Sequence, residues 1–448
     1  MKIRAQRSIF VLLLLASTIR LSAQDTLRFS LTEAKAYAMQ NSYVIRNSSL
    51  DVDAARKKVW ETIATGLPQV SGSASYTNFL NLPVSLIPAE FVGGNPGEYF
   101  EVTFGQKFNS DFGFTVNQKL FDGSYIVGVG SAKLYLQLSS QAKEKTEIEI
   151  RQAVEQAYYG ALVARRNLSV LQENLSNNQK QFSDTKAMFE NGFVEEQDVD
   201  QLKLIVQNSE NEIIKAEREI RVAEMVLKYV MGVTVTDPVV LIDELDNFID
   251  PILSGKEEPS GFDLATHIDY RLLESQRLSQ IKLLRLEQSA YLPNLDAFYS
   301  WNKTSYGNSW NLFKSNVAWY PSSMWGLNLT VPIFSAGNKA ARVKQARIEL
   351  EKAENDQKLA EQTLQKDYLT AVADLESAID QYRNDTDNKQ LAKKIYDKTT
   401  VKYNNGMISS IELSQTESQY IQAQRAWVAS ATQLLNSKIN LDKAIGKL

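Results

Sequence analysis

The chain has 448 residues, of which 44% are hydrophobic and 23% charged, the composition of an ordinary folded protein. Its formal net charge of −4 at pH 7 gives no support for nucleic acid as a partner, because nucleic-acid binders carry clustered basic faces. Cysteine is absent, which excludes disulfides, thiolate catalysis and lipidation of an N-terminal cysteine.

Residues 1–23 have the three parts of a secretory signal peptide. Lys2, Arg4 and Arg7 precede the apolar run 9–16, which is too short to span a bilayer. Small residues follow, so we expect cleavage after Ala23, with an uncleaved anchor as the alternative. No later stretch of about 18 residues stays free of charge, so we expect no membrane-spanning helix.

The first repeat, residues 24–232, predicts a series of elements that ends in a helical hairpin. In chain order these are a helix over 31–65, strands over 68–77 and 111–121, a long helix over 123–190 and a shorter helix over 194–230. Pro68 cannot continue a helix, so the chain turns extended there. Asn191 and Gly192 suit the left-handed conformation that ends a helix, so they mark the tip of the hairpin.

The long helix of about 68 residues would measure roughly 100 Å, so neighbouring helices must support it. Apolar residues recur from Ile150 to Leu175 in 4-3 alternation, the heptad seam of a coiled coil. An ordinary antiparallel coiled coil is the simpler explanation of this pattern. The two shorter helices together match the length of the long one. We therefore expect them to stack end to end against it, forming a rod that can cross a periplasm.

Residues 233–261 join the repeats, and three prolines, Pro238, Pro251 and Pro259, prevent one long helix there. We expect this segment to form an equatorial belt around the rods. The second repeat, residues 262–448, predicts the same order: a helix over 262–290, strands over 293–302 and 324–333, a long helix over 337–404 and a shorter helix over 408–444. Its landmarks follow those of the first repeat at a spacing of about 214 residues. Its own heptad seam is lost at Asp385.

The four strands alternate apolar and polar residues, as transmembrane barrel strands of about ten residues do. In 111–121, Phe112, Phe114 and Val116 share one face, and Thr115 and Asn117 lie on the other. A soluble sheet packed on helices would give the same alternation. Aromatic residues gather toward the strand ends and the loops 80–110 and 303–323, as in membrane-interface girdles. Four strands cannot close a barrel, whereas three chains would supply about twelve and leave a channel.

The doubled unit resembles the TolC outer-membrane efflux family. The resemblance rests on the Leu-Pro before each first strand, residues 329–334 (Leu-Thr-Val-Pro-Ile-Phe), the second hairpin tip around Lys402 to Glu412, and residues 441–446 (Leu-Asp-Lys-Ala-Ile-Gly). It covers nearly all of the chain after residue 23. It implies a mainly α-helical coiled-coil barrel in the periplasm, joined to a twelve-stranded trimeric β-barrel in outer-membrane lipid. The implied partners are a periplasmic adaptor and an inner-membrane transporter, and the implied role is efflux or type I secretion.

The resemblance also implies a periplasmic gate at the hairpin tips. Family acidic residues six and nine positions after the second tip glycine correspond to Glu412 and to Gln415, which has lost the charge. Asp198 holds the sixth position in the first repeat, and Tyr403 matches a family tyrosine of the closed state. The basic residue expected two positions after the glycine is Ile408.

Adaptor docking is expected at the tips themselves, which consist of Asn191, Gly192 and Phe193 in the first repeat and Asn405, Gly406 and Met407 in the second. A ring of carboxylates would favour cations in a narrow pore. Glu195, Glu196, Asp198 and Asp200 also cluster after the first tip. Carboxylates in the first turn of a helix equally offset its dipole, so both explanations stay open.

The sequence contains no enzyme signature, and we expect no cofactor and no metal site. His267 is the only histidine, so no histidine-based triad or metal cluster can be assembled, and it is expected at a helix start. Two other functions remain: a soluble periplasmic coiled-coil scaffold and a self-sufficient porin. About 100 Å of helix has no use in a simple pore.

Overall fold

The computed structural model describes residues 27–255, 261–310 and 317–448. The expected signal peptide, Pro259 and part of the expected loop 303–323 lie outside these residues. The chain divides into two compact units. Unit 1 holds residues 1–50, 141–271 and 358–448, and unit 2 holds 51–140 and 272–357. Each unit takes residues from both sequence repeats.

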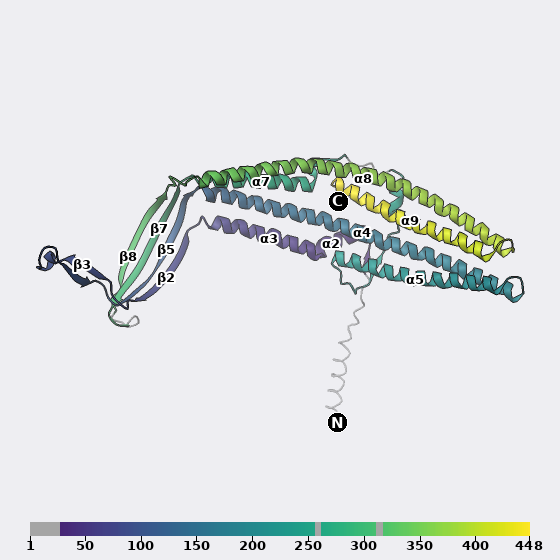
Figure 1. The fold of residues 1–448 in the computed structure, drawn as a ribbon, viewed down its shortest axis with the longest axis horizontal. Helices are drawn as coiled ribbons and strands as arrows, with labels where there is room; N and C mark the ends of the chain where they lie inside the picture. The colour runs from purple at the N-terminus through teal and green to yellow at the C-terminus, as the bar shows by residue number, and fades with distance from the viewer. Residues whose placement is uncertain (1–26, 256–260, 311–316) are drawn as a thin grey trace, which may run out of the picture. The chain divides into compact units, whose positions relative to one another are not determined.

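The element order repeats along the chain (Figure 1). The first half contains α2 (Leu31–Asn41), α3 (Tyr43–Ala64), β2 (Gln69–Asn78), β5 (Phe108–Asp122), α4 (Gly123–Glu190) and α5 (Glu196–Met231). The second half contains α7 (Ile268–Ser289), β7 (Asn294–Gly307), β8 (Tyr320–Thr330), α8 (Asn338–Asn404) and α9 (Ser410–Ala444). None of the helices in the described residues is both long and apolar enough to cross a membrane.

Unit 2 contains one antiparallel sheet of four strands in the order β2-β5-β7-β8 (Figure 1). The register pairs Val116 with Val70 on β2 and with Tyr299 on β7, so apolar residues line up on one face. In the single chain this face is exposed, including Trp325 at 77%. The alternative of a sheet packed on helices predicts a covered apolar face, and the exposed face argues against it.

The strands of the sheet are longer than predicted at their loop ends, because β5 begins at Phe108 and β7 continues to Gly307. The predicted loop 80–110 contains a second hairpin, formed by β3 (Val84–Pro88) and β4 (Tyr99–Thr103), with a short 3₁₀ turn, η1 (Ala89–Val92), after β3. The second half has no such hairpin in its described residues.

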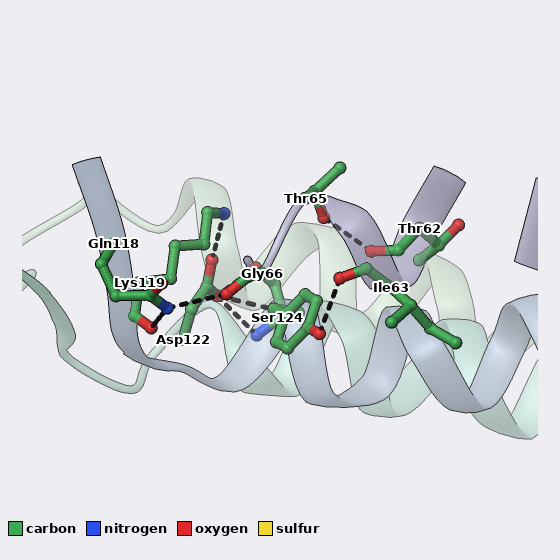
Figure 2. A network of polar contacts seen from close by, with 9 residues as sticks. Thr62, Ile63, Thr65, Gly66, Gln118, Lys119, Asp122 and Ser124 are labelled. Atoms are coloured by element: carbon green, nitrogen blue, oxygen red, sulfur yellow. Dashed lines mark hydrogen bonds and ion pairs between the residues drawn. The ribbon is translucent and has the colours of Figure 1, made fainter. Parts of the chain in front are cut away.

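Polar contacts join the α3–β2 connection to the β5–α4 connection in unit 2 (Figure 2). The Gln118 side chain of β5 donates to the Gly66 carbonyl at 2.8 Å, and the Tyr125 hydroxyl of α4 donates to the Ile63 carbonyl at 3.1 Å. Asp122 caps α4 by accepting the Ser124 backbone N–H at 2.9 Å. A Cβ at Gly66 would lie 2.2 Å from the Tyr125 ring, so a larger residue there would displace the ring from this position.

Unit 1 is a bundle in which α4 runs beside α5 and α8 runs beside α9 (Figure 1). Its main core includes Val154 and Tyr158 of α4 and Leu434, Leu435 and Ile439 of α9. The mainly α-helical fold with a four-stranded sheet confirms the predicted fold class. The seam of α8 differs from the prediction, because Asp385 does not end it. Asp385 is buried and accepts the Gln381 side chain at 3.0 Å, so a satisfied polar group continues the packed face.

The segment between the repeats packs on these helices. It contains β6 (Val239–Leu241), which pairs in parallel with β1 (Leu27–Phe29), and α6 (Asp246–Leu253). Phe248 lies 4.9 Å from the Tyr159 ring of α4. Pro251 lies inside α6, so it does not prevent a short helix, although α6 ends two residues later. The predicted single helix over 31–65 was wrong, because the chain leaves helical geometry at Ser42, between α2 and α3.

Candidate functional site: the hairpin tips

Both tips close by the same backbone motif. At the first tip Gly192 has φ +77°, and the Phe193 N–H donates to the Met188 carbonyl at 2.9 Å. At the second tip Gly406 has φ +69°, and the Met407 N–H donates to the Lys402 carbonyl at 3.0 Å. These are Schellman-type helix ends, which need a residue in the left-handed region. The Asn-Gly pair at each tip therefore accounts for the position of the turn, because the glycine adopts the left-handed conformation that ends the helix.

The residue after each tip glycine is a large exposed apolar side chain. Phe193 is 80% exposed and Met407 is 71% exposed in the single chain. The asparagines are used locally instead: Asn191 donates to the Ala187 carbonyl at 2.7 Å and Asn405 donates to the Val401 carbonyl at 2.8 Å. Each tip therefore presents one large exposed apolar side chain, while its asparagine side chain stabilises the helix end.

The acidic residues after the tips lie in the first turns of α5 and α9. Asp198 accepts the Glu195 backbone N–H at 3.3 Å in a capping box. Glu412 is exposed, and its backbone N–H donates to the Ser409 hydroxyl at 3.4 Å, so its carboxylate is not the cap. Gln415 is exposed one turn further along α9. Capping accounts for Asp198, whereas the Glu412 side chain is exposed and does not cap its helix.

Tyr403 lies inside the bundle near the second tip. It is buried in a cluster with Leu202, Tyr396, Leu413 and Tyr420, and Ile408 packs against that cluster. The Thr185 hydroxyl of α4 donates to the Tyr403 hydroxyl at 3.4 Å. Ile408, at the position where the resemblance implies a basic residue, therefore contributes apolar packing. In a single chain the second tip is held by this apolar cluster together with hydrogen bonds from α4.

A line of buried polar residues on α4 escaped the sequence analysis. Its members are Asn174, Asn178, Gln181 and Thr185. The first three donate to partners on the second hairpin: Asn174 to Gln424 at 2.6 Å, Asn178 to Glu417 at 2.6 Å and Gln181 to Asn404 at 2.7 Å. Their 4-3-4 spacing continues the heptad pattern, so the sequence did contain a sign that these polar residues face the neighbouring helices. A search for apolar residues alone passes over it.

In the described residues no group of three or more histidine, cysteine or acidic side chains could hold a metal ion. His267 lies between the 3₁₀ turn η2 (Leu264–Thr266) and α7, at the helix start that its sequence position predicts. It is buried, and burial lowers the pKa of its imidazole against the opposing effect of Asp269.

Comparisons with known proteins place this geometry in a family. The family model described as outer membrane efflux protein matches residues 36–233 and 275–447. A comparison with curated protein sequences finds no match.

Solved structures of outer-membrane channels share the fold. CusC superposes with a TM-score of 0.73 at 16% identity, covering 96% of this chain and 95% of its own. MtrE of Neisseria gonorrhoeae, solved in an open state, gives 0.72 at 17% identity, covering 93% of this chain and 88% of its own. VceC of Vibrio cholerae gives a TM-score of 0.69 at 14% sequence identity, covering 93% of this chain and 96% of its own.

The resemblance inferred from the sequence is thus confirmed, and so is the prediction of a channel rather than an enzyme. Because the family model spans most of the chain, this protein belongs to the outer membrane efflux protein family and is an outer-membrane channel component of a tripartite efflux system.

Proposed function

We propose that three copies of this chain close one twelve-stranded channel in outer-membrane lipid, with the helical part in the periplasm. The observation that carries this proposal is the four-stranded sheet with two strands at its edges. β2 pairs only with β5 and β8 pairs only with β7 among the described residues. Unpaired strand edges are not tolerated in hydrocarbon, so a neighbouring copy must supply each partner. The exposed apolar face of the sheet then contacts lipid.

The assembly can be tested on the purified chain in detergent. We expect a trimer by native mass spectrometry and single channels when it is added to planar bilayers. A monomer without conductance would overturn the closed channel. Solubility of the mature chain without detergent would instead favour the periplasmic scaffold.

The hairpin tips are the proposed meeting point with a periplasmic adaptor, which links the channel to an inner-membrane transporter. Phe193 and Met407 support this, because each is a large apolar side chain exposed at a hairpin end, where a partner would remove it from water. Replacing both by serine should abolish co-purification with a periplasmic adaptor that the unaltered channel retains, while the trimer stays intact. A self-sufficient porin would retain no adaptor even with the unaltered tips.

The second tip is the proposed periplasmic gate, with Glu412 as its charged residue and Asp198, Tyr403 and Gln415 around it. Threefold symmetry would place three Glu412 carboxylates around one opening, where they attract cations. Asp198 is engaged in a cap, and Tyr403 is buried, so in this proposal they position the tip.

Glu412→Ala is expected to raise single-channel conductance and to weaken block by divalent cations, because it removes both side-chain bulk and the charge that binds them. Conductance with and without millimolar Mg²⁺ in planar bilayers measures both effects. Gln415→Ala is the control, since it shortens a neutral side chain three residues away without removing charge. Unchanged block in Glu412→Ala would place the carboxylate away from the pore.

A further inference from the structure

One buried side chain joins all four helices of the bundle in unit 1. Asn178 of α4 donates to the Ser209 hydroxyl of α5 at 3.0 Å and to the Glu417 carboxylate of α9 at 2.6 Å. Its carbonyl oxygen accepts the Tyr396 hydroxyl of α8 at 3.3 Å. Asn178 is 4% exposed and Glu417 is 5% exposed. The amide therefore uses two donors and one acceptor to connect the first hairpin with the second.

No lysine, arginine or histidine in the described part of the chain forms an ion pair with Glu417. The titratable or charged side chains on the helices around it are Glu173 on α4, Glu212 on α5, Lys393, Tyr396 and Asp397 on α8, and Tyr420 and Arg425 on α9. Arg425 forms an ion pair with Glu212 at 3.0 Å, and Lys393 forms one with Glu173 at 3.7 Å. Both cations are thus engaged elsewhere. A buried carboxylate without a cation is costly, so protonation is the alternative that burial favours.

A cavity of about 360 Å³ gives this carboxyl a route to exchange a proton. Glu417 and Ser209 line it together with the Glu212–Arg425 pair, and its lining residues come from α4, α5 and α9. Burial raises the pKa of the Glu417 carboxyl to about 7, while the Asn178 hydrogen bond opposes that rise.

We propose that Asn178 and Glu417 form a proton-sensitive latch that holds the two helical hairpins together when Glu417 is protonated and lets them separate when it is charged. This inference rests on the proposed gate, because separating the two hairpins at Asn178 and Glu417 would move the hairpin tips that form the gate.

The sign of the pH effect on hairpin packing follows from the linkage between proton binding and conformation. A carboxyl whose pKa is raised in the packed state stabilises that state fully below its ordinary pKa of about 4.5. This contribution is lost as the pH rises toward about 7. The ratio of packed to separated hairpins should therefore fall over that range, by up to about 100-fold if separation restores ordinary hydration.

The test uses the whole trimer in planar bilayers from pH 4.5 to pH 8. Conductance of the unaltered channel should rise across this range. Glu417→Gln keeps an oxygen for Asn178 but carries no charge, so it should hold the low conductance at every pH. Asn178→Ala should give the high conductance at every pH. Glu210→Gln is the control, because it removes an exposed carboxylate next to Ser209 on α5. It should titrate like the unaltered channel.

A second readout does not depend on conductance. The chain has no cysteine, so Lys186→Cys on α4 and Lys402→Cys on α8 accept spin labels at exposed sites without competing thiols. In trimers diluted with unlabelled chains, the distance between the labels should lengthen as the pH rises, and Glu417→Gln should remove that change. A pH response that persists in Glu417→Gln overturns the latch. A distance change without any channel activity supports the latch and overturns the proposed channel instead.

Discussion

Gly232→Ala is expected to destabilise the helical unit by about 3 kcal/mol or more. Gly232 ends α5 with φ +77°, a conformation that an L-residue adopts at a cost of about 1–2 kcal/mol. A Cβ there would also lie 2.5 Å from the Asn41 carbonyl oxygen and 2.8 Å from its carbon. Those atoms are backbone at the break between α2 and α3, so they cannot move aside as a side chain would.

The second repeat provides the matched control for this substitution. Gly446 follows α9 at the corresponding place with φ +72°, but a Cβ there would meet nothing within 4 Å. Gly446→Ala should therefore cost only the conformational term, about 1–2 kcal/mol. Guanidinium unfolding of both variants, followed by far-UV circular dichroism, measures the difference. Equal shifts of the two midpoints would show that the approach of α5 to Asn41 is looser than the structure has it.

Leu434→Ala is expected to cost about 2–5 kcal/mol, because a fully buried leucine loses its transfer free energy and leaves a cavity. Leu434 is 0% exposed and lies in the main core with Tyr158, Tyr382 and Trp427, which come from α4, α8 and α9. These aromatic rings come from three different helices, so they cannot collapse together into the space of one side chain.

Leu434→Met separates packing from volume in the same unfolding experiment. It keeps the side-chain volume and should cost less than about 1.5 kcal/mol. If alanine and methionine destabilise the unit equally, the site tolerates no change of shape, and the cavity is not the cause. If neither substitution changes the free energy of unfolding, the packing around Leu434 does not contribute to the stability of unit 1.

The ends of the two long helices could be predicted from residues close to them in the sequence. The helix predicted over 123–190 is α4 itself, Gly123–Glu190, and the helix predicted over 337–404 differs from α8 by one residue. Asp122 caps the first, and the left-handed glycines Gly192 and Gly406 end both. Caps and glycine turns involve residues within one turn of each other, so the sequence contains all the information they need.

The candidate site was predicted less completely. Phe193, Met407 and Glu412 are exposed, and their roles in docking and gating stay predictions. Tyr403 is buried, and Ile408 packs beside it. The polar line through Asn178 was missed, because an asparagine in a heptad seam is indistinguishable from a surface asparagine until its partners are known. Those partners are 31 residues away on α5, 239 on α9 and 218 on α8.

The sequence by itself determined the doubled order of elements, the ends of the helices and the alternation of the strands. Each of these follows from interactions between near neighbours in the chain. The tertiary structure decided the break at Ser42, the continuation of the α8 seam through Asp385 and the union of four helices at Asn178. The union at Asn178 depends on distant segments, because three other helices supply its hydrogen-bond partners. Asp385 is buried by the packing of α8 in the bundle, although the hydrogen bond that it accepts comes from Gln381 on the same helix.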